Sequence, residues 1–388
     1  MNEVINISGI NQVPGDNKIS SEERDRLAKK YSRTHQILSL TGNIIFFAVL
    51  LILIFTGLSK EIERIAFGYT TNNYLALLIF FGIIGAGQSL INFPLDFYSG
   101  YILEHKYDLS NQTITGYFKE KFKGFALGII IGIPLMFAFY YILSNSGDMW
   151  WLVLGIVMFV FSILLGRIAP TVIMPLFYKF VPVENEDIKN RLTGLCKKTG
   201  VKVQGIFTFD MSKNTKKANA AFTGMGKSRR IILGDTLMNN FSVNEIETVF
   251  AHEVGHYTKR HILKMMTVST LVTFIGLFVT AKLYEASLGY FGFTAVNEIA
   301  ALPLLFLYLS LYGLVTTPIS NIQSRMYEWE ADTFALETTK DRDSFISAME
   351  KLAGQNLADK TPNKVIEFLF HSHPSLDKRI QFARDFRF

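Results

Sequence analysis

The chain has 388 residues, of which 49% are hydrophobic and 19% charged, with a net charge of +6. Its mean hydropathy is +0.25. Several apolar runs reach about 20 residues, long enough to cross a hydrocarbon core, so an ordinary soluble protein of two or three domains is excluded. The single cysteine, Cys196, excludes an internal disulfide and a cysteine-rich metal site. The basic residues form no stripe beside interleaved aromatics, which argues against nucleic-acid binding.

Six membrane spans are predicted from the apolar runs. They are expected at 37–58, 74–97, 124–143, 150–168, 262–282 and 299–320. Basic segments alternate with basic-poor ones at each crossing, so both termini and both long polar segments are predicted on the cytoplasmic side. The first apolar run is too long for the core of a signal peptide, and no cleaved signal is expected.

These spans divide the chain into five parts. We expect a cytoplasmic N-terminal segment (1–36), four spans with a cytoplasmic loop at 98–123 (37–175), a cytoplasmic α/β insertion (176–261), two more spans (262–320), and a cytoplasmic helical segment (321–388). The predicted fold class is mostly α, a polytopic membrane protein with a small α/β insertion.

The α/β insertion is predicted to hold a helix and three strands. The helix is expected at 186–199 and the strands at 201–209, 219–223 and 229–233. The glycine-rich stretch at 224–228 resembles the end of a phosphate-binding loop, but Ala221 stands where that pattern requires glycine. We therefore expect a hairpin turn there, and no nucleotide.

A helix that starts after Ser242 carries the pattern His-Glu-Val-Gly-His. His252 and His256 are four residues apart and share one helical face, so both imidazoles can bind one Zn²⁺. Glu253 lies beside that face, where it can act as general base on a water molecule. The alternative is a pair of histidines on a solvated helix. We expect His261, five residues further on, to lie at the membrane surface.

Such a site needs a third protein ligand, and the candidates follow the sixth span. Glu328 and Asp332 are four residues apart on one helical face, whereas Glu330 points elsewhere. A glutamate could bind the metal while the aspartate accepts the free ring N–H of a ligating histidine. Spacing alone leaves open an acidic surface helix that binds no metal.

Four motifs together resemble the zinc peptidase family that contains the type I CaaX prenyl endopeptidases and the bacterial stress protease HtpX. They are the stretch at 219–237, the His-Glu-Val-Gly-His motif at 252–256, the Ser-Arg-x-x-Glu-x-x-x-Asp pattern at 324–332, and His-Pro-Ser-Leu at 373–376. A further stretch, 104–113, resembles a loop of the prenyl endopeptidase branch and favours that branch over HtpX.

The resemblance implies roles for individual residues. It implies that Glu328 is the third zinc ligand and that Asp332 supports a histidine ligand from behind. It places Asn219 and Ala220 on a strand that binds the substrate backbone, and it implies that His373 stabilises the tetrahedral oxyanion, with Arg379 near the same site. The family fold that it implies is a helical barrel around an intramembrane chamber.

The resemblance also implies the reaction, one Zn²⁺ per chain, and the substrate. The expected activity is removal of the -aaX tripeptide from the C-terminus of a prenylated protein. Six spans instead of seven suggest a bacterial-type member that lacks the first span, with the bacterial inner membrane favoured over the endoplasmic reticulum membrane of a eukaryote. A monomer embedded in the bilayer is expected.

Two other functions stay open. The first is a bacterial quality-control protease that cuts unprenylated membrane proteins with the same chemistry. The second is a transporter or lipid-handling protein with a structural metal, which polar residues within the spans (Asn43, Gln88 and Asn92) would allow.

Overall fold

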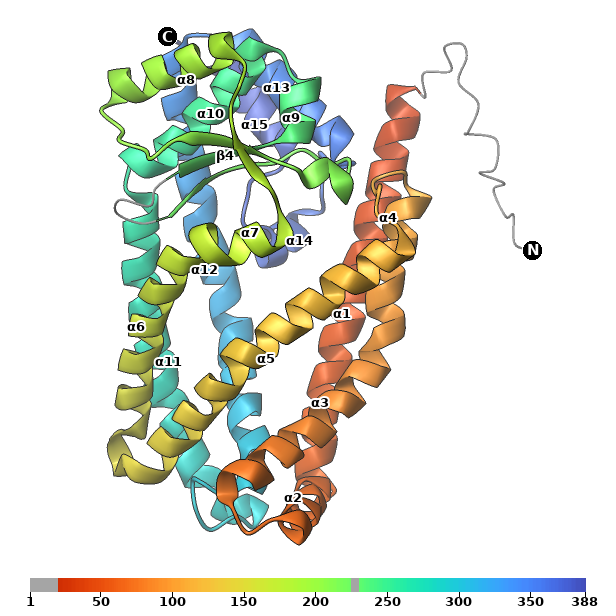
Figure 1. Ribbon diagram of the computed structural model, residues 1–388, viewed down its shortest axis with the longest axis vertical. Coiled ribbons are helices and arrows are strands. Elements are labelled where there is room, and N and C mark those ends of the chain that lie inside the picture. The colour runs from red at the N-terminus through yellow and green to blue at the C-terminus, as the bar shows by residue number, and fades with distance from the viewer. Residues whose placement is uncertain (1–19, 225–229) are drawn as a thin grey trace, which may run out of the picture.

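The structure is a computed structural model that describes residues 20–224 and 230–388. Figure 1 shows two parts, a lower bundle of long helices and an upper head of shorter helices around one small sheet. The turn expected at 224–228 lies almost entirely outside the described residues. The first residue of the strand expected at 229–233 and the N-terminal segment before residue 20 also lie outside the described residues.

Among the described residues, six helices are long and apolar enough to cross a membrane, which confirms the six predicted spans. They are α1 (Ser21–Phe55), α3 (Asn73–Phe97), α5 (Ile114–Asn145), α6 (Trp150–Ile168), α11 (His261–Ser287) and α12 (Leu302–Thr339). Several are longer than their apolar runs. The side chain of Ser20 caps α1 by accepting a hydrogen bond from the Glu23 N–H. The helix therefore begins before the apolar run, with several polar turns. Similarly, α12 continues past residue 320 into the head.

The six helices form a ring. Each packs against the next in the order α1, α3, α5, α6, α11, α12, and the contact between α12 and α1 closes the ring. Figure 1 shows these helices side by side, with α5 crossing at a slant. A closed ring of spans agrees with the predicted helical barrel.

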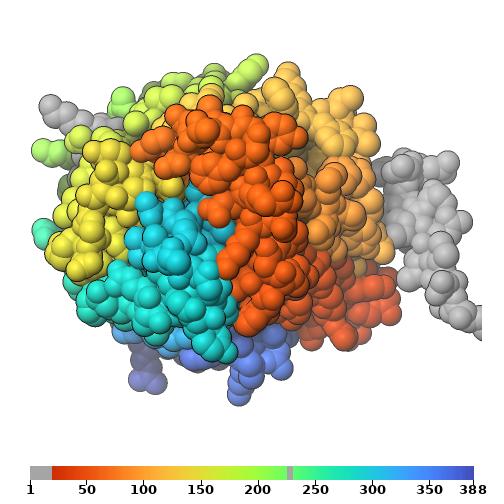
Figure 2. Space-filling view, turned by 90° about the horizontal axis from the view of Figure 1, so that it is seen from below, coloured from red at the N-terminus to blue at the C-terminus, as the bar shows by residue number. Residues whose placement is uncertain are grey.

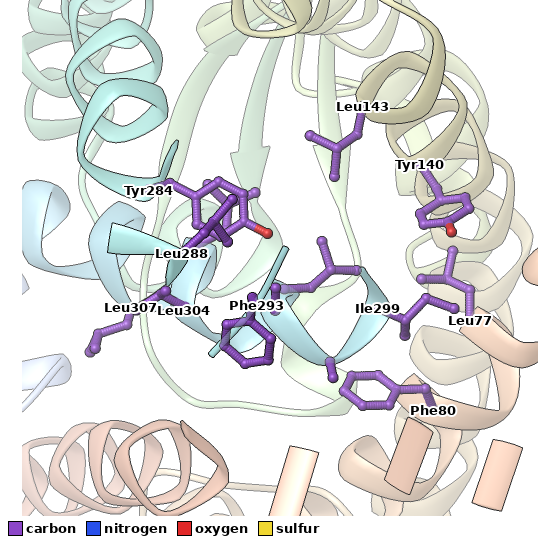
Figure 3. Close-up of a cluster of buried hydrophobic side chains, with 14 of the residues drawn as sticks. Leu77, Phe80, Tyr140, Leu143, Tyr284, Leu288, Phe293, Ile299, Leu304 and Leu307 are labelled. Atoms are coloured by element: carbon purple, nitrogen blue, oxygen red, sulfur yellow. The ribbon is translucent and has the colours of Figure 1, made fainter. Parts of the chain in front are cut away.

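The apolar core of the ring lies at the end far from the head. Its residues come from the far ends of the spans and from α2 (Leu58–Tyr69), a short amphipathic helix that the sequence analysis did not predict. Figure 3 shows part of this cluster, with Phe80, Tyr140, Tyr284 and Leu304 among the labelled side chains. Seen from below, Figure 2 shows the segments of this end meeting side by side. The spans are therefore firmly packed to one another at this end.

Nearer the head, several positions on α3 and α5 have no close neighbour. Six glycines of α3 and α5 have open space where a Cβ would stand, with no heavy atom within 4 Å. They are Gly82, Gly85, Gly87, Gly124, Gly128 and Gly132. Glycines in membrane helices commonly mark close helix contacts, and these do not. No neighbouring helix therefore packs closely against these six positions.

The head contains a four-stranded sheet of order β1-β2-β4-β3. Its strands are β1 (Phe180–Pro182), β2 (Ile206–Phe209), β3 (Ala220–Thr223) and β4 (Arg230–Gly234). β2 and β4 are parallel, whereas β1–β2 and β3–β4 are antiparallel. Three residues of β1 were too short a signal to predict, and the strand expected at 201–209 begins only at Ile206. As the last strand in this order, β3 leaves one edge unpaired within the sheet.

Helices cover the sheet and connect the head to the spans. The head helices are α8 (Glu186–Thr199), α9 (Asp235–Asn240), α10 (Val243–Thr258), α13 (Arg342–Gln355), α14 (Lys364–Phe370) and α15 (Leu376–Asp385). Short helices α4 (Leu103–Lys106) and α7 (Met174–Phe177) follow π-helical turns at Tyr98–Ile102 and Ala169–Ile173. A second apolar core joins α8, α10, α13 and α15 to the sheet and the end of α12. This core fixes α10 against α12, where the candidate site lies.

Candidate metal centre

The histidine motif lies on α10, whose first turn is held by a capping box. The Ser242 hydroxyl accepts a hydrogen bond from the Glu245 N–H, and the Glu245 carboxylate accepts one from the Ser242 N–H at 2.6 Å. Ile246, Phe250 and Val254 are fully buried on one face of the helix. This apolar face docks α10 in the head and fixes the direction of the histidine side chains.

A close approach between α10 and α12 brings the acidic residues to the histidines. Gly255 lies against Ala331, and a Cβ on Gly255 would stand 3.1 Å from the Ala331 Cα and 3.2 Å from the Phe334 Cβ. A larger residue at either position would separate the helices. Because both are small, Glu328 on α12 reaches His252 and His256, although it is far from them in the sequence.

Three side chains form the candidate metal site. The Nε2 atoms of His252 and His256 are 3.1 Å apart. Glu328 places Oε2 3.4 Å from His252 Nε2 and Oε1 3.3 Å from His256 Nε2. A tetrahedral zinc with bonds of about 2.0–2.1 Å to nitrogen separates its ligand atoms by about 3.3 Å, which these distances match.

A second observation supports a metal at this position. Glu328 Oε2 is buried and accepts no hydrogen bond among the described residues, although His252 Nε2 and Arg379 Nη1 lie 3.4 and 3.5 Å away. A buried carboxylate oxygen without a hydrogen bond is costly, and a cation between the three donors would satisfy it. The donor set of two imidazoles and one carboxylate suits zinc. The residues present therefore fit the group that the sequence implies.

A buried ion pair supports His252 from behind. Asp332 Oδ1 lies 2.8 Å from His252 Nδ1, and Arg379 binds both oxygens of Asp332, from Nη2 at 2.6 Å and from Nε at 2.8 Å. Asp332 is fully buried and Arg379 nearly so. Burial disfavours the charge of Arg379, but the carboxylates of Asp332 and Glu328 outweigh it and raise the pKa of the guanidinium.

The same surroundings govern the protonation of His252. Burial lowers the pKa of His252, but the neighbouring carboxylates of Asp332 and Glu328 outweigh burial and raise that pKa to about 9. Without a metal, this imidazole therefore holds a proton at neutral pH. Metal binding must displace the proton, and metal affinity will fall as the pH falls.

A different chain of contacts supports His256. Its Nδ1 lies 3.0 Å from His261 Nδ1, and His261 Nε2 lies 3.0 Å from Glu330 Oε2. If His256 binds metal through Nε2, its Nδ1–H donates to His261, whose Nε2–H then donates to Glu330. His261 is only 1% exposed and stacks on Tyr327. His261 is also the first residue of α11, a candidate span, so its position at the membrane surface stays a prediction.

Glu253 faces the free edge of the sheet. Its Oε2 accepts a hydrogen bond of 3.1 Å from the backbone N–H of Phe222 on β3. Ala220 is the first residue of β3, and Asn219 precedes it with an exposed side chain and a carbonyl that accepts from the Gly234 N–H. The structure thus brings the edge of β3 beside the residue next to His252.

His373 approaches the site from the C-terminal segment. Its Nε2 lies 3.3 Å from Glu328 Oε1, and its side chain is 63% exposed. Two residues hold its loop. The Arg325 guanidinium donates to the carbonyls of His371 and Glu367 at 2.6 and 3.1 Å, and the Glu367 carboxylate accepts from the Ser375 N–H at 3.1 Å. His373 therefore lies at the open side of the site.

Sequence reasoning gave no role to four of these supporting residues. His261 and Glu330 contact each other behind His256, and Arg325 and Glu367 hold the loop of His373. Arg325 lies inside the motif at 324–332, so the motif itself was a signal for it. Glu367 is one acidic residue in a short helix, and no local pattern sets it apart.

Two family models together match almost the whole chain. One, described as the CAAX prenyl protease N-terminal region with five membrane helices, matches residues 10–179. The other, described as peptidase family M48, matches residues 182–387. Within the described part of 10–179, four helices are long and apolar enough to cross a membrane, one fewer than the five of that description.

Individual proteins match over similar lengths. The chain is 29% identical to the "Uncharacterized metalloprotease YhfN" of Bacillus subtilis, covering 92% of this chain and 84% of that one. It is 28% identical to CAAX prenyl protease 1 of Saccharomyces cerevisiae, covering 92% and 85%. The crystal structure of S. mikatae Ste24p superposes with a TM-score of 0.84 at 27% identity, covering 97% and 93%.

Proposed function

The chain belongs to peptidase family M48 and is a multi-pass membrane metalloendopeptidase, and we propose that it uses one zinc ion to cut near the C-terminus of a lipid-modified protein. The triangle of His252, His256 and Glu328 carries the proposal. Three protein donors with one open position are typical of a catalytic zinc, whereas a structural zinc takes four. This weighs against a transporter or lipid-handling protein with a structural metal.

The proposed chemistry assigns the metal one task and the chain the others. Bound zinc would polarise the scissile carbonyl and activate a water molecule for attack. Glu253 is the proposed general base, which takes the proton of the attacking water and delivers it to the leaving amine. The hydrogen bond from Phe222 holds the Glu253 carboxylate between the helix and the edge of β3.

Three further residues would act on the substrate, and two would act from behind His252. The free edge of β3 at Asn219 and Ala220 would pair with an extended peptide backbone. His373, exposed beside Glu328, would donate a hydrogen bond to the developing oxyanion. Asp332 and Arg379 would fix the orientation of His252 without contacting the substrate.

A prenylated C-terminus is the substrate that we propose. Relatives at 26–32% identity are named CAAX prenyl protease 1 or its homologue. The largest apolar core of the spans lies at the end far from the head, and six glycines of the part nearer the head have no heavy atom beside them. An isoprenoid chain could lie in that part while the -aaX tripeptide pairs with β3.

The similarity to the metalloprotease YhfN of a bacterium keeps a second substrate class in view. A bacterial-type enzyme could cut unprenylated membrane proteins by the same chemistry. We propose the bacterial inner membrane as its location, with both termini cytoplasmic, because basic segments flank the spans on the side of the head. We further propose that it acts as a monomer.

A cleavage assay tests these proposals. Purified protein in lipid nanodiscs is incubated with matched farnesylated and unfarnesylated CaaX peptides, and the products are identified by mass spectrometry. We expect wild type to release the tripeptide from the farnesylated peptide, and Glu253→Gln to be about 10³-fold slower. Metal analysis should find about one zinc per chain.

Different results contradict different parts of the proposal. Equal cleavage by wild type and Glu253→Gln would exclude Glu253 as the base. Zinc-free protein that is fully active would exclude the metal. Faster cutting of an unprenylated membrane protein than of the farnesylated peptide would favour the quality-control function.

A further inference from the structure

The free edge of β3 offers few backbone groups to a substrate. Antiparallel strands alternate between residues that bond to their partner and residues that face away from it. The Gly234 N–H donates to the Asn219 carbonyl, so Asn219 bonds toward β4. By alternation, Ala218, Ala220 and Phe222 direct their N–H and C=O groups to the outer edge. The hydrogen bond from the Phe222 N–H to Glu253 fits this alternation.

One end of this edge is already occupied by a side chain. Asn356 Oδ1 accepts a hydrogen bond from the Ala218 N–H at 2.8 Å, and Asn356 Nδ2 donates to the Ala218 carbonyl at 3.1 Å. The carboxamide therefore makes both bonds that a residue of a neighbouring strand would make. It stands where an incoming peptide would pair with Ala218.

The position of Asn356 is fixed by its own helix. It is the C-cap residue of α13, and its N–H donates to the Leu352 carbonyl at 3.0 Å. The preceding Gln355 donates from Nε2 to the Lys216 carbonyl at 2.7 Å. The end of α13 is thereby held to the segment that leads into β3. On the part of the edge that the structure describes, the backbone groups of Ala220 and the carbonyl of Phe222 make no outward hydrogen bond.

We propose that Asn356 is a stop that ends the substrate-binding edge of β3 and so limits how many residues can follow the scissile bond. This inference rests on the proposed function, because it assumes that a peptide pairs with β3 beside the metal. It adds a specificity-determining residue, and it gives the release of a short C-terminal peptide a structural cause.

The register indicates which part of the substrate meets the stop. An antiparallel pairing is the more stable one, and it directs the C-terminal part of the peptide from Phe222 toward Ala218. Glu253, next to Phe222, marks where the bond is cut. A strand advances about 3.4 Å per residue, so about three residues fit between the cut and the carboxamide of Asn356. A longer tail would have to leave the edge.

A series of peptides tests the stop. The peptides share one prenylated sequence and carry two to six residues after the cut, and kcat/KM is measured for each. For wild type, kcat/KM should fall once more than about three residues follow the cut. Asn356→Ala frees both groups of Ala218, so the ratio of kcat/KM for the six-residue tail to that for the three-residue tail should rise about tenfold.

Gln355→Ala is the matched control. It removes a neighbouring carboxamide from the same helix end, but that carboxamide bonds to Lys216, beyond the stop at Ala218, so with Asn356 in place the ratio should stay at the wild-type value. Because the ratio is internal, it does not depend on how much enzyme is folded. Asn356→Ser, which keeps a small polar C-cap, is a second variant should Asn356→Ala fail to fold.

Each result decides the question. An unchanged ratio in Asn356→Ala and Asn356→Ser, with wild type active, overturns the stop and leaves the proposed function standing. A changed tolerance for residues before the cut overturns the proposed direction and with it the stop. If wild type cuts none of the peptides, the proposed function fails, and this inference fails with it.

Discussion

The two histidines of the metal centre are supported from opposite sides in different ways. His252 contacts a fully buried ion pair, Asp332 with Arg379, in which two hydrogen bonds join the charges. His256 contacts a neutral ring, His261, which in turn contacts Glu330, whose side chain is 42% exposed. One support ends inside the protein, and the other ends at its surface.

The site depends on a buried ion pair behind His252 and on hydrogen bonding behind His256. A buried charge that loses its partner is strongly destabilising because water cannot replace that partner. An exposed carboxylate that is lost can be replaced by water at little cost. We therefore expect changes behind His252 to affect both folding and metal binding, and changes behind His256 to affect metal binding alone.

The largest effect is expected for Asp332→Asn. The change removes the nearer of the two carboxylates that balance the buried guanidinium of Arg379, so the free energy of unfolding should fall by about 3 kcal/mol. Thermal unfolding of the metal-free protein measures it, and zinc content should fall as well. The double variant Asp332→Asn with Arg379→Gln should recover part of the stability. A single variant as stable as wild type would remove the contrast between the two sides.

A smaller effect is expected for His261→Phe, on zinc affinity. Phenylalanine can keep the stacking on Tyr327 but cannot accept the Nδ1–H of His256, so zinc should bind about tenfold more weakly, with little change in stability. Competition with a chelator measures the affinity. His261→Gln, which can accept and donate, should restore most of it. Equal affinities in wild type and His261→Phe would mean that His256 needs no support from this side.

The contact of His261 with His256 shows what the sequence could not supply. His252, Glu253 and His256 lie on one helix, so the helical period was sufficient to group them. On a continuous helix, His261 would point well away from His256. The structure breaks the helix at Arg260, which has a φ of 58°, and the chain turns so that His261 faces back. No glycine or proline announces that break.

Contacts between residues far apart in the sequence could be predicted only in part. Spacing selected Glu328 and Asp332 as a pair, but their approach to α10 depends on the contact between Gly255 and Ala331, which requires the fold. The six spans were predicted because a bilayer imposes length and apolarity on local sequence. The pairing of Ala218 with Asn356 joins segments that no local pattern relates.

A substitution at the start of α10, the helix that carries both histidines, is a control for the comparison between the supports of His252 and His256. Glu245 caps α10 and pairs with Lys351 at 2.7 Å. Burial raises the pKa of Glu245, but hydrogen bonds from Lys351 and two serines outweigh burial, so the net pKa is lowered. A lowered carboxyl pKa contributes stability above the unfolded-state value of about 4.3, and that stability is lost as the pH falls through the folded pKa.

Glu245→Gln should therefore reduce the free energy of unfolding by about 1 kcal/mol at neutral pH and by less in acid. Urea unfolding at pH 7 and in acid measures this. The zinc affinity of the folded protein should not change, since both histidines share the helix. A difference from wild type that grows as the pH falls would show that the sign of the shift is wrong.

The smallest effect is expected for Glu330→Gln, at the exposed end of the support of His256. Glutamine still accepts a hydrogen bond from His261 Nε2, and only the charge is lost where water surrounds the side chain. Zinc affinity should fall by about threefold at most, and less at high salt, because screening weakens exposed charges. Chelator competition at two salt concentrations measures it. A loss as large as that of His261→Phe would mean that the charge of Glu330, and not the ring of His261, supports His256, and the two sides of the centre would then work by the same principle.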